Sequence, residues 1–123
     1  MIKGVGVDVV NIGRMRRWEK IEGLLDRYFH PEELKAAKTR GSASTLSLAA
    51  RFAAKEAFGK ALGTGLKGLQ LKDIQVVNNH NGKPDILVYN KAYEAFKSVG
   101  GEVMHLSLTH EQDYAIAMVV IEG

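Results

Sequence analysis

The chain has 123 residues, a length that suits one domain with a modest core, and we expect residues 1–123 to form that single domain. Its 46% hydrophobic and 25% charged residues exclude an intrinsically disordered chain, and no apolar run approaches the ~20 residues that a membrane-spanning helix needs. The absence of cysteine excludes disulfides and thiolate chemistry and, together with an N-terminus that lacks a secretory pattern, favours a cytoplasmic protein.

The first segment, residues 2–12, is expected to form a strand. Val5, Val7 and Val9 alternate with Gly4, Gly6 and Asp8, as in a strand with two unlike faces. One face is apolar, whereas the other is bare backbone followed by a carboxylate. A ligand or another chain can therefore approach closely just before Asp8.

Helical patterns fill the next part of the chain. Apolar residues recur at helical spacing from Trp18 to Phe29, and Pro31 suits the first turn of a second, short helix that ends near Gly41. A long helix is expected from about Thr45 to Leu62, with Gly63 as its stop.

Strand patterns dominate the remainder. Residues 69–79 and 83–89 form a predicted hairpin around an Asn-Gly turn, Asn90 is the expected cap of a helix that closes at residues 100–101, and residues 102–110 and 114–122 form a second predicted hairpin. The chain is therefore predicted to be α+β, with helices packed against a mainly antiparallel sheet.

The segment RFAAKEAFGKALGTG, residues 51–65, raises the question of why a helix rich in small residues carries four charged ones. Glu56 and Lys60 lie one turn apart and would form a surface ion pair worth only ~0.3–0.5 kcal/mol. Alternatively, the alanines keep the helix slim so that its polar stripe meets a ligand. If Asp8 and Glu56 converge, their oxygens can hold Mg²⁺, and Arg51, Lys55 and Lys60 would suit a polyphosphate.

Other polar segments allow weaker interpretations. Gly63 and Gly65 are a helix stop or a close approach to a ligand, and the residues 81–84 are a turn or a phosphate-binding loop. The glycines do not form a P-loop, because its spacing is absent. No nucleophile elbow is present either, which argues against a hydrolase built on Ser107 and His110. The spacing of the four histidines matches no familiar metal site.

The charge is unevenly distributed along the chain. Residues 1–60 carry 12 Lys/Arg against 7 Asp/Glu, which favours anionic partners such as phosphate, nucleic acid or an acidic protein. A nucleic-acid-binding module is the main alternative from another class. Aromatic residues are only 7% and do not alternate with the basic ones, as a base-stacking surface would require, so we expect no nucleic-acid partner.

Four segments together indicate a family: GVGVDVVNIGRM (4–15), RFAAKEAFGKALGTG (51–65), NGKP (81–84) and SLTH (107–110). In their order and spacing the chain resembles, over its full length, the holo-[acyl-carrier-protein] synthases, which are small 4′-phosphopantetheinyl transferases. The resemblance implies Mg²⁺-dependent transfer of 4′-phosphopantetheine from coenzyme A to a serine of apo acyl carrier protein, with release of adenosine 3′,5′-bisphosphate, in support of fatty acid biosynthesis. It also implies a homotrimer whose active sites lie between neighbouring subunits.

The resemblance also implies site residues. The family's metal-binding carboxylates fall on Asp8 and Glu56, and the catalytic residues would be these two and Lys60. The residues expected to bind the coenzyme are Arg51, Lys60, Gly63, Gly65, Asn81, Gly82, Lys83, Pro84 and His110. Thr109 replaces the commoner serine before the histidine but keeps the hydroxyl.

Two questions stay open at the level of sequence. Either Glu56 or a metal-held water would accept the proton of the carrier serine. The basic residues of the segment 14–20, above all Arg14 and Arg17, form the expected docking surface for the acidic carrier, although they also suit a solvated helix face. A noncatalytic relative that only binds coenzyme A or carrier would be expected to lack Asp8 or Glu56, and both are present.

Overall fold

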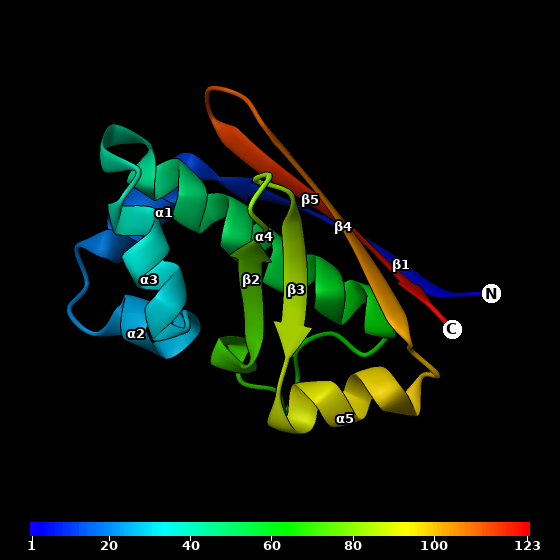
Figure 1. Ribbon diagram of the computed structural model, residues 1–123. Helices are drawn as coiled ribbons and strands as arrows, with labels where there is room; N and C mark the ends of the chain where they lie inside the picture. The colour runs from blue at the N-terminus through cyan, green and yellow to red at the C-terminus, as the bar shows by residue number, and fades with distance from the viewer.

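One long helix, α4 (Ser44–Leu62), organises the computed structural model, which describes residues 1–123. It packs against two separate antiparallel sheets (Figure 1). The larger sheet has the order β1 (Ile2–Asn11), β5 (Tyr114–Glu122), β4 (Val103–His110), and the smaller pairs β2 (Ile74–Asn78) with β3 (Pro84–Val88). The predicted α+β class and both predicted hairpins are confirmed, although the strands form two sheets and not one.

The contact between β1 and α4 depends on two glycines. A Cβ added to Gly4 would lie 1.8 Å from the carbonyl oxygen of Ala61, and one added to Gly6 would lie 2.0 Å from that of Ala57. Only glycine therefore lets the strand approach the helix this closely. The bare face of β1 was expected to admit a ligand or another chain, but at Gly4 and Gly6 it meets α4 of the same chain.

The first predicted helix is interrupted. Helix α1 (Ile12–Glu19) and helix α2 (Leu24–Tyr28) are separated by a turn in which Gly23 has φ +79°. The single helix predicted from Trp18 to Phe29 is therefore wrong. The apolar spacing is nevertheless used, because the ring of Trp18 packs 5.3 Å from that of Tyr28 and 4.9 Å from that of Phe52.

Of the remaining helices, only α3 (Pro31–Lys38) begins at a side-chain cap; the N-cap residues of α4 and α5 (Asn90–Ser98), Ala43 and Tyr89, make no cap hydrogen bond. Helix α3 starts at Pro31 as predicted, with His30 as N-cap and Glu33 completing a capping box. The N-cap residue of α5 is Tyr89 and not Asn90, whose side chain donates to Asp73. Short 3₁₀ turns at Gly41–Ala43 and Leu71–Asp73 complete the order of elements.

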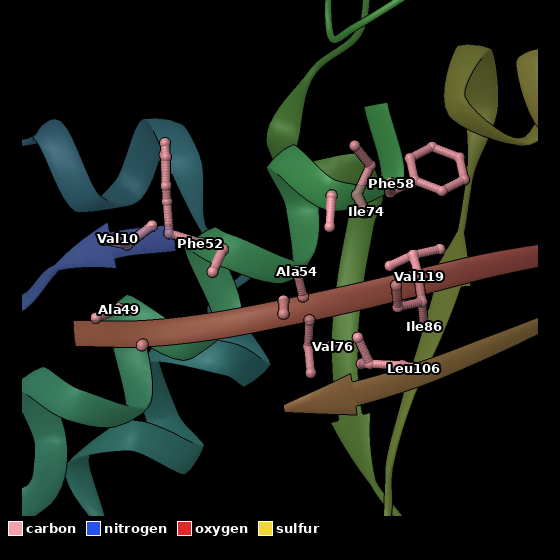
Figure 2. Close-up of a cluster of buried hydrophobic side chains, with 14 of the residues drawn as sticks. Val10, Ala49, Phe52, Ala54, Phe58, Ile74, Val76, Ile86, Leu106 and Val119 are labelled. Carbon is pink, nitrogen blue, oxygen red and sulfur yellow. The ribbon is translucent and has the colours of Figure 1, made fainter. Parts of the chain in front are cut away.

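The core lies on both sides of α4 (Figure 2). Its alanines and two phenylalanines meet inward residues of β5 on one side and of β2 and β3 on the other; the buried set includes Ala49, Phe52, Ala53, Ala54, Ala57, Phe58, Ala61, Ile74, Val76, Ile86, Val119 and Ile121. Since α4 is enclosed on several faces, charged residues on it are forced either into the interior or to its few open edges. No helix of the structure is both long and apolar enough to cross a lipid bilayer.

Candidate active site

Helix α4 divides its charged residues between two faces. Arg51 and Lys55 point toward β2, whereas Glu56 and Lys60 point toward β1. Each residue advances about 100° around the helix axis, so the two pairs lie on different sides of the helix. The single polar stripe predicted from the sequence is therefore wrong, and the two pairs have different surroundings.

Asp8, Glu56 and Lys60 are brought together where β1 crosses α4. Nζ of Lys60 donates to Oδ1 of Asp8 (3.0 Å) and to the carbonyl oxygen of Val7 (3.1 Å). Burial, and then the negative charge of Asp8, raises the pKa of the Glu56 carboxyl, while Arg14 and Lys60 act in the opposite direction. The two carboxylates are thus close enough to repel each other, as predicted for a shared site.

The donor set fits a magnesium ion. No group of three or more His, Asp or Glu side chains that could hold a metal occurs in the structure, so Asp8 and Glu56 would be the only protein ligands of this kind. Mg²⁺ is commonly held by one or two carboxylates while water and substrate phosphates fill the other positions. A mutually repelling, partly buried carboxylate pair beside an exposed lysine has the chemistry that such an ion needs.

Arg14 adjoins this pair, although the sequence assigned it to carrier docking. Its guanidinium lies over the ring of Trp18 (5.2 Å to the centroid) and of Phe52 (5.6 Å), and its charge lowers the pKa of Glu56. Its Nε is buried without a hydrogen-bond partner. Arg17, by contrast, is exposed on α1, as a docking residue must be.

Arg51 lines a cavity of about 300 Å³ on the other face of α4, together with Ser47, Val76, Asn78 and His110. Its guanidinium donates to the carbonyl oxygen of Val76 (2.5 Å), to Oδ1 of Asn78 (3.0 Å) and to the hydroxyl of Ser47 (3.3 Å). No carboxylate forms an ion pair with it; burial lowers its pKa, and the charge of Glu33 partly offsets this effect. A buried cation that no carboxylate contacts directly favours an anionic ligand in the cavity.

Most of the other predicted coenzyme residues do not line the Arg51 cavity. Gly63 ends α4 with φ +84°, and Gly65, with φ +71°, donates its amide to Gly59, so both glycines shape the turn after the helix. The residues Asn81, Gly82, Lys83 and Pro84 form the turn between β2 and β3, where Lys83 and Pro84 line a hollow of about 350 Å³ against β4.

Lys55 does not lie at the ligand site. It is fully buried and bonded to Glu33 at 2.6 Å, so the sequence-based assignment of this lysine to a polyphosphate is wrong. The sequence analysis also missed Glu33 and Asn78 as functional neighbours. Glu33 has the signature of a helix cap three residues after His30, and nothing in the sequence points to its second partner 22 residues away.

Comparisons with known proteins agree with the motifs. The model of the 4′-phosphopantetheinyl transferase superfamily matches residues 4–119. The holo-[acyl-carrier-protein] synthase of Treponema denticola is 50% identical over 123 residues, which span 100% of both chains. The crystal structure of the holo-[acyl-carrier-protein] synthase from Neisseria meningitidis matches with a TM-score of 0.90 and 34% identity, over 100% of both chains.

A holo-(acyl-carrier-protein) synthase from Bacillus anthracis, solved in complex with CoA (3′,5′-ADP), matches with a TM-score of 0.82 and 34% identity, over 98% of this chain and 96% of that one. Both the sequence and the fold therefore match the same group over nearly the whole length. The family resemblance inferred from the four motifs is confirmed. The chain belongs to the 4′-phosphopantetheinyl transferase superfamily.

Proposed function

We propose that this protein transfers 4′-phosphopantetheine from coenzyme A to a serine of apo acyl carrier protein and releases adenosine 3′,5′-bisphosphate. One observation carries the proposal beyond family membership. Asp8 and Glu56, 48 positions apart in the chain, interact beside Lys60 at the crossing of β1 and α4. A noncatalytic coenzyme-binding relative would have no need for this costly pair of repelling carboxylates.

The reaction breaks the phosphoanhydride bond of coenzyme A and forms a phosphodiester with the carrier serine. The hydroxyl oxygen of the carrier serine attacks the β-phosphorus of coenzyme A, the bond from that phosphorus to the bridging oxygen breaks, and adenosine 3′,5′-bisphosphate leaves with the bond's electrons. Glu56 is the carboxylate that we assign to accept the serine proton, since it lies beside Asp8 and Lys60. Lys60, exposed at the same edge, stabilises the charge that builds on the leaving phosphate.

A divalent cation belongs to this mechanism. We assign Mg²⁺ to Asp8 and Glu56, where it would neutralise part of the pyrophosphate charge of the coenzyme when bound. Lys60 then exchanges its present contact with Asp8 for a phosphate oxygen. The affinity of the site for Mg²⁺ comes from two hard oxygen ligands that repel each other without it.

The nucleotide end of coenzyme A is assigned to the Arg51 cavity. A 3′-phosphate there supplies the anion that Arg51 lacks, and His110 at the mouth of the cavity is a second donor. Arginine suits this task because its planar guanidinium still has N–H groups to offer after its contacts with Val76, Asn78 and Ser47. Lys83 and the backbone of the residues 81–84 extend the phosphate-binding surface.

We propose a homotrimer with each active site shared between subunits. Arg51 and Glu56 face opposite sides of α4, which favours a site in which the acid pair comes from one subunit and the Arg51 cavity from its neighbour. The outer face of the larger sheet supports association, because Val5, Val7 and Val9 are 55%, 53% and 53% exposed and continue onto Met118. An apolar strip of this kind on a sheet typically marks an interface.

The carrier is assigned to α1, where the exposed Arg17 and the partly buried Arg14 face an acidic partner. Arg14 belongs to this docking surface and its charge also acts on Glu56, so it joins carrier binding to the reacting groups. We also propose that the protein is cytoplasmic and serves fatty acid biosynthesis by activating carriers.

Mass spectrometry of one reaction tests the proposal. With coenzyme A and Mg²⁺, a serine-bearing apo carrier should gain the mass of one 4′-phosphopantetheinyl group, and the gain should disappear when EDTA removes the cation or when the carrier serine is replaced by alanine. No gain with any of several apo carriers, although coenzyme A binds, would identify a noncatalytic binding protein instead.

A further inference from the structure

The outer edge of β2 has no neighbouring strand. The strand pairs with β3 on one side only, and the unpaired backbone groups on its other side need partners. Three charged side chains supply them. Lys55 donates to the carbonyl oxygen of Ile74, Glu33 accepts from the amide of Val76 (3.0 Å), and Arg51 donates to the carbonyl oxygen of Val76 (2.5 Å). These side chains of α3 and α4 take the place of a further strand.

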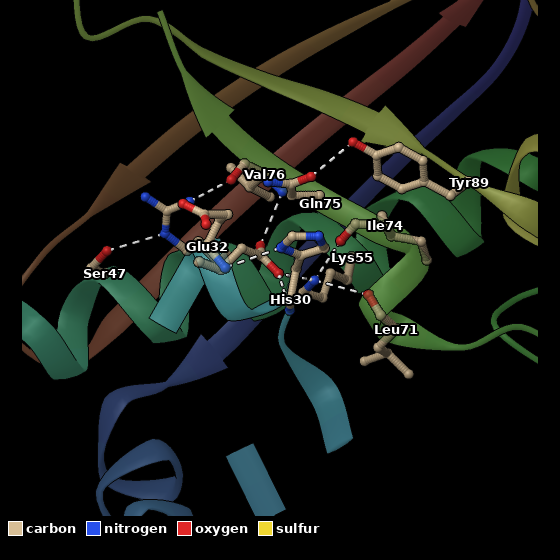
Figure 3. Close-up of polar contacts among 11 residues, drawn as sticks. His30, Glu32, Ser47, Lys55, Leu71, Ile74, Gln75, Val76 and Tyr89 are labelled. Atoms are coloured by element: carbon tan, nitrogen blue, oxygen red, sulfur yellow. Dashed lines mark hydrogen bonds and ion pairs between the residues drawn. The ribbon is translucent and has the colours of Figure 1, made fainter. Parts of the chain in front are cut away.

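Glu33 and Lys55 are the buried part of this arrangement and form what we call the β2 clamp. They bond to each other at 2.6 Å, and both side chains are fully inaccessible to solvent. Lys55 also donates to the carbonyl oxygen of Leu71 (2.9 Å), as Figure 3 shows, and Glu33 also accepts from the amide of His30 (3.0 Å). Both charged groups are therefore hydrogen-bonded on several sides, as buried charges must be.

The β2 clamp fixes the position of β2 more than it stabilises the fold. A buried ion pair often stabilises a fold no better than apolar side chains of the same volume would. Apolar side chains, however, could not bond to the edge of β2. The direction of each bond is also fixed, because an ammonium group such as that of Lys55 can only donate and a carboxylate such as that of Glu33 can only accept. Lys55 therefore bonds to backbone carbonyl oxygens, and Glu33 bonds to backbone amides.

The held strand forms one wall of the Arg51 cavity. Val76 and Asn78 both line the cavity, and both also bond to the guanidinium of Arg51. Asn78 donates in turn to the carbonyl oxygen of Gly82, in the turn between β2 and β3. A shift of β2 would therefore move the wall, the partners of Arg51 and this turn together. The acid pair on the other face of α4 and the docking surface on α1 would not move with them.

We propose that Glu33 and Lys55 are positioning residues for coenzyme A: by bonding the free edge of β2 to α3 and α4, they set the shape of the Arg51 cavity. This inference rests on the proposed function, because it takes the cavity as the site of the nucleotide. Neither side chain touches the coenzyme. The clamp therefore acts on the binding of coenzyme A and not on the binding of the carrier or on the chemical step.

The variant Glu33→Gln tests the inference with little change of shape. Glutamine keeps one acceptor oxygen but loses the second acceptor and the charge opposite Lys55. The KM for coenzyme A should rise about 10-fold, while the KM for carrier and the kcat at saturating coenzyme A stay within about threefold of wild type. The Kd for coenzyme A without carrier, measured by calorimetry, should rise by the same factor.

A matched control separates positioning from loss of stability. Ile121→Val removes one buried methyl group at the end of β5 and should lower the stability of the fold without changing the KM for coenzyme A. If Glu33→Gln behaves as this control does, with an unchanged KM and Kd for coenzyme A, the clamp has no positioning role. If the wild-type protein itself transfers nothing to any carrier, the proposed function fails, which the same assay reports separately.

Amide exchange in the wild-type protein tests the clamp even if Glu33→Gln does not fold. The amide of Val76 bonds only to a side chain, that of Glu33, and should exchange with solvent as slowly as the β2 amides that pair with β3. If the amide of Val76 exchanges fast while the β2 amides that pair with β3 exchange slowly, Glu33 does not hold the strand edge, and the inference is overturned.

Discussion

Glu56 differs from Asp8 mainly in its surroundings. Burial and the charge of Asp8 raise the pKa of Glu56, so the fold carries an electrostatic cost whenever both carboxylates are ionised. Lys60 and Arg14 offset only part of this cost. Such costs are characteristic of functional sites, where a group is kept for its chemistry and against local stability.

Glu56→Gln should therefore stabilise the cation-free protein at neutral pH and still abolish transfer. The substitution removes a carboxylate that burial and Asp8 disfavour, so the melting temperature in EDTA should rise. Loss of a metal ligand and proton acceptor should reduce kcat/KM by about 100-fold or more. Thermal unfolding and the carrier mass assay measure the two effects, and a variant that is both destabilised and active would contradict the assignment.

The gain in melting temperature should depend on pH in a defined direction. Because the folded pKa of Glu56 is raised, the wild type loses stability as pH rises from the ordinary range of a glutamate through the folded pKa. Glu56→Gln lacks this loss. The difference between the two melting temperatures should therefore be largest at neutral pH and vanish at acid pH, where Glu56 is protonated in both states. A difference that is independent of pH would have another cause.

Arg17 and Arg14 should separate carrier docking from catalysis. Arg17→Glu reverses a charge on the exposed side of α1, so under the proposed docking the KM for carrier should rise about 10-fold with kcat and the KM for coenzyme A unchanged. Arg14→Glu should also lower kcat, because Arg14 adjoins Glu56. Lys91→Glu, an equal charge change on the exposed side of α5, is the control and should alter neither constant. An equal effect of Arg17→Glu on both KM values would exclude α1 as the docking surface.

At the scale of elements, the position of Asp8 depends on how closely β1 lies on α4. Gly6→Ala would place a methyl group 2.0 Å from the carbonyl oxygen of Ala57, and neither backbone can yield without separating strand from helix. The free energy of unfolding should fall by about 3 kcal/mol or more, as measured with denaturant.

Gly13→Ala in α1 is the matched control, because the nearest atom, Oδ1 of Asn11, belongs to a side chain that can yield at the cost of its cap hydrogen bond from the amide of Arg14, while alanine favours a helix. Its effect should stay within about 1 kcal/mol. Equal losses in the two variants would show that the close contact of β1 with α4 does not limit stability.

The elements differ in how far the sequence predicts them. Alternation predicts that β1 has an apolar face and a glycine face but does not say which is inward, and here the valines face outward because only the glycines fit against α4. The helical spacing of the apolar residues does not reveal the break at Gly23, because the residues on both sides of the break still reach the same core.

The site residues also differ in how far the sequence predicts them. Asp8 and Glu56 are predictable because a motif marks each of them, whereas the contact of Lys55 with Glu33 depends on how α3 packs on α4, which no local pattern records. Arg51 was expected to lie near a phosphate, but its contacts with β2 could not be predicted, because they too depend on how the elements pack.

At the scale of the whole molecule, the outward valines predict association. Val7→Glu places a charge at the centre of the exposed strip and should convert the proposed trimer into monomers, as measured by light scattering after gel filtration. Each monomer would keep both halves of the site but could not join them, so transfer should fall with the loss of the trimer. A monomeric and fully active Val7→Glu variant would mean that one chain holds a complete site.

Mixing inactive variants tests the shared site directly. Asp8→Asn damages the acid pair and Arg51→Gln damages the cavity on the opposite face of α4, so each alone should be inactive at low coenzyme A. In randomly mixed trimers, about a quarter of the sites should combine an intact acid pair from one subunit with an intact cavity from its neighbour, and about that fraction of wild-type activity should return. Asp8→Asn mixed with Glu56→Gln is the control, because both damage the same half and no combination restores it. If the first mixture regains no more activity than the control, although mixed trimers form, then the acid pair and the Arg51 cavity that serve one coenzyme belong to the same chain.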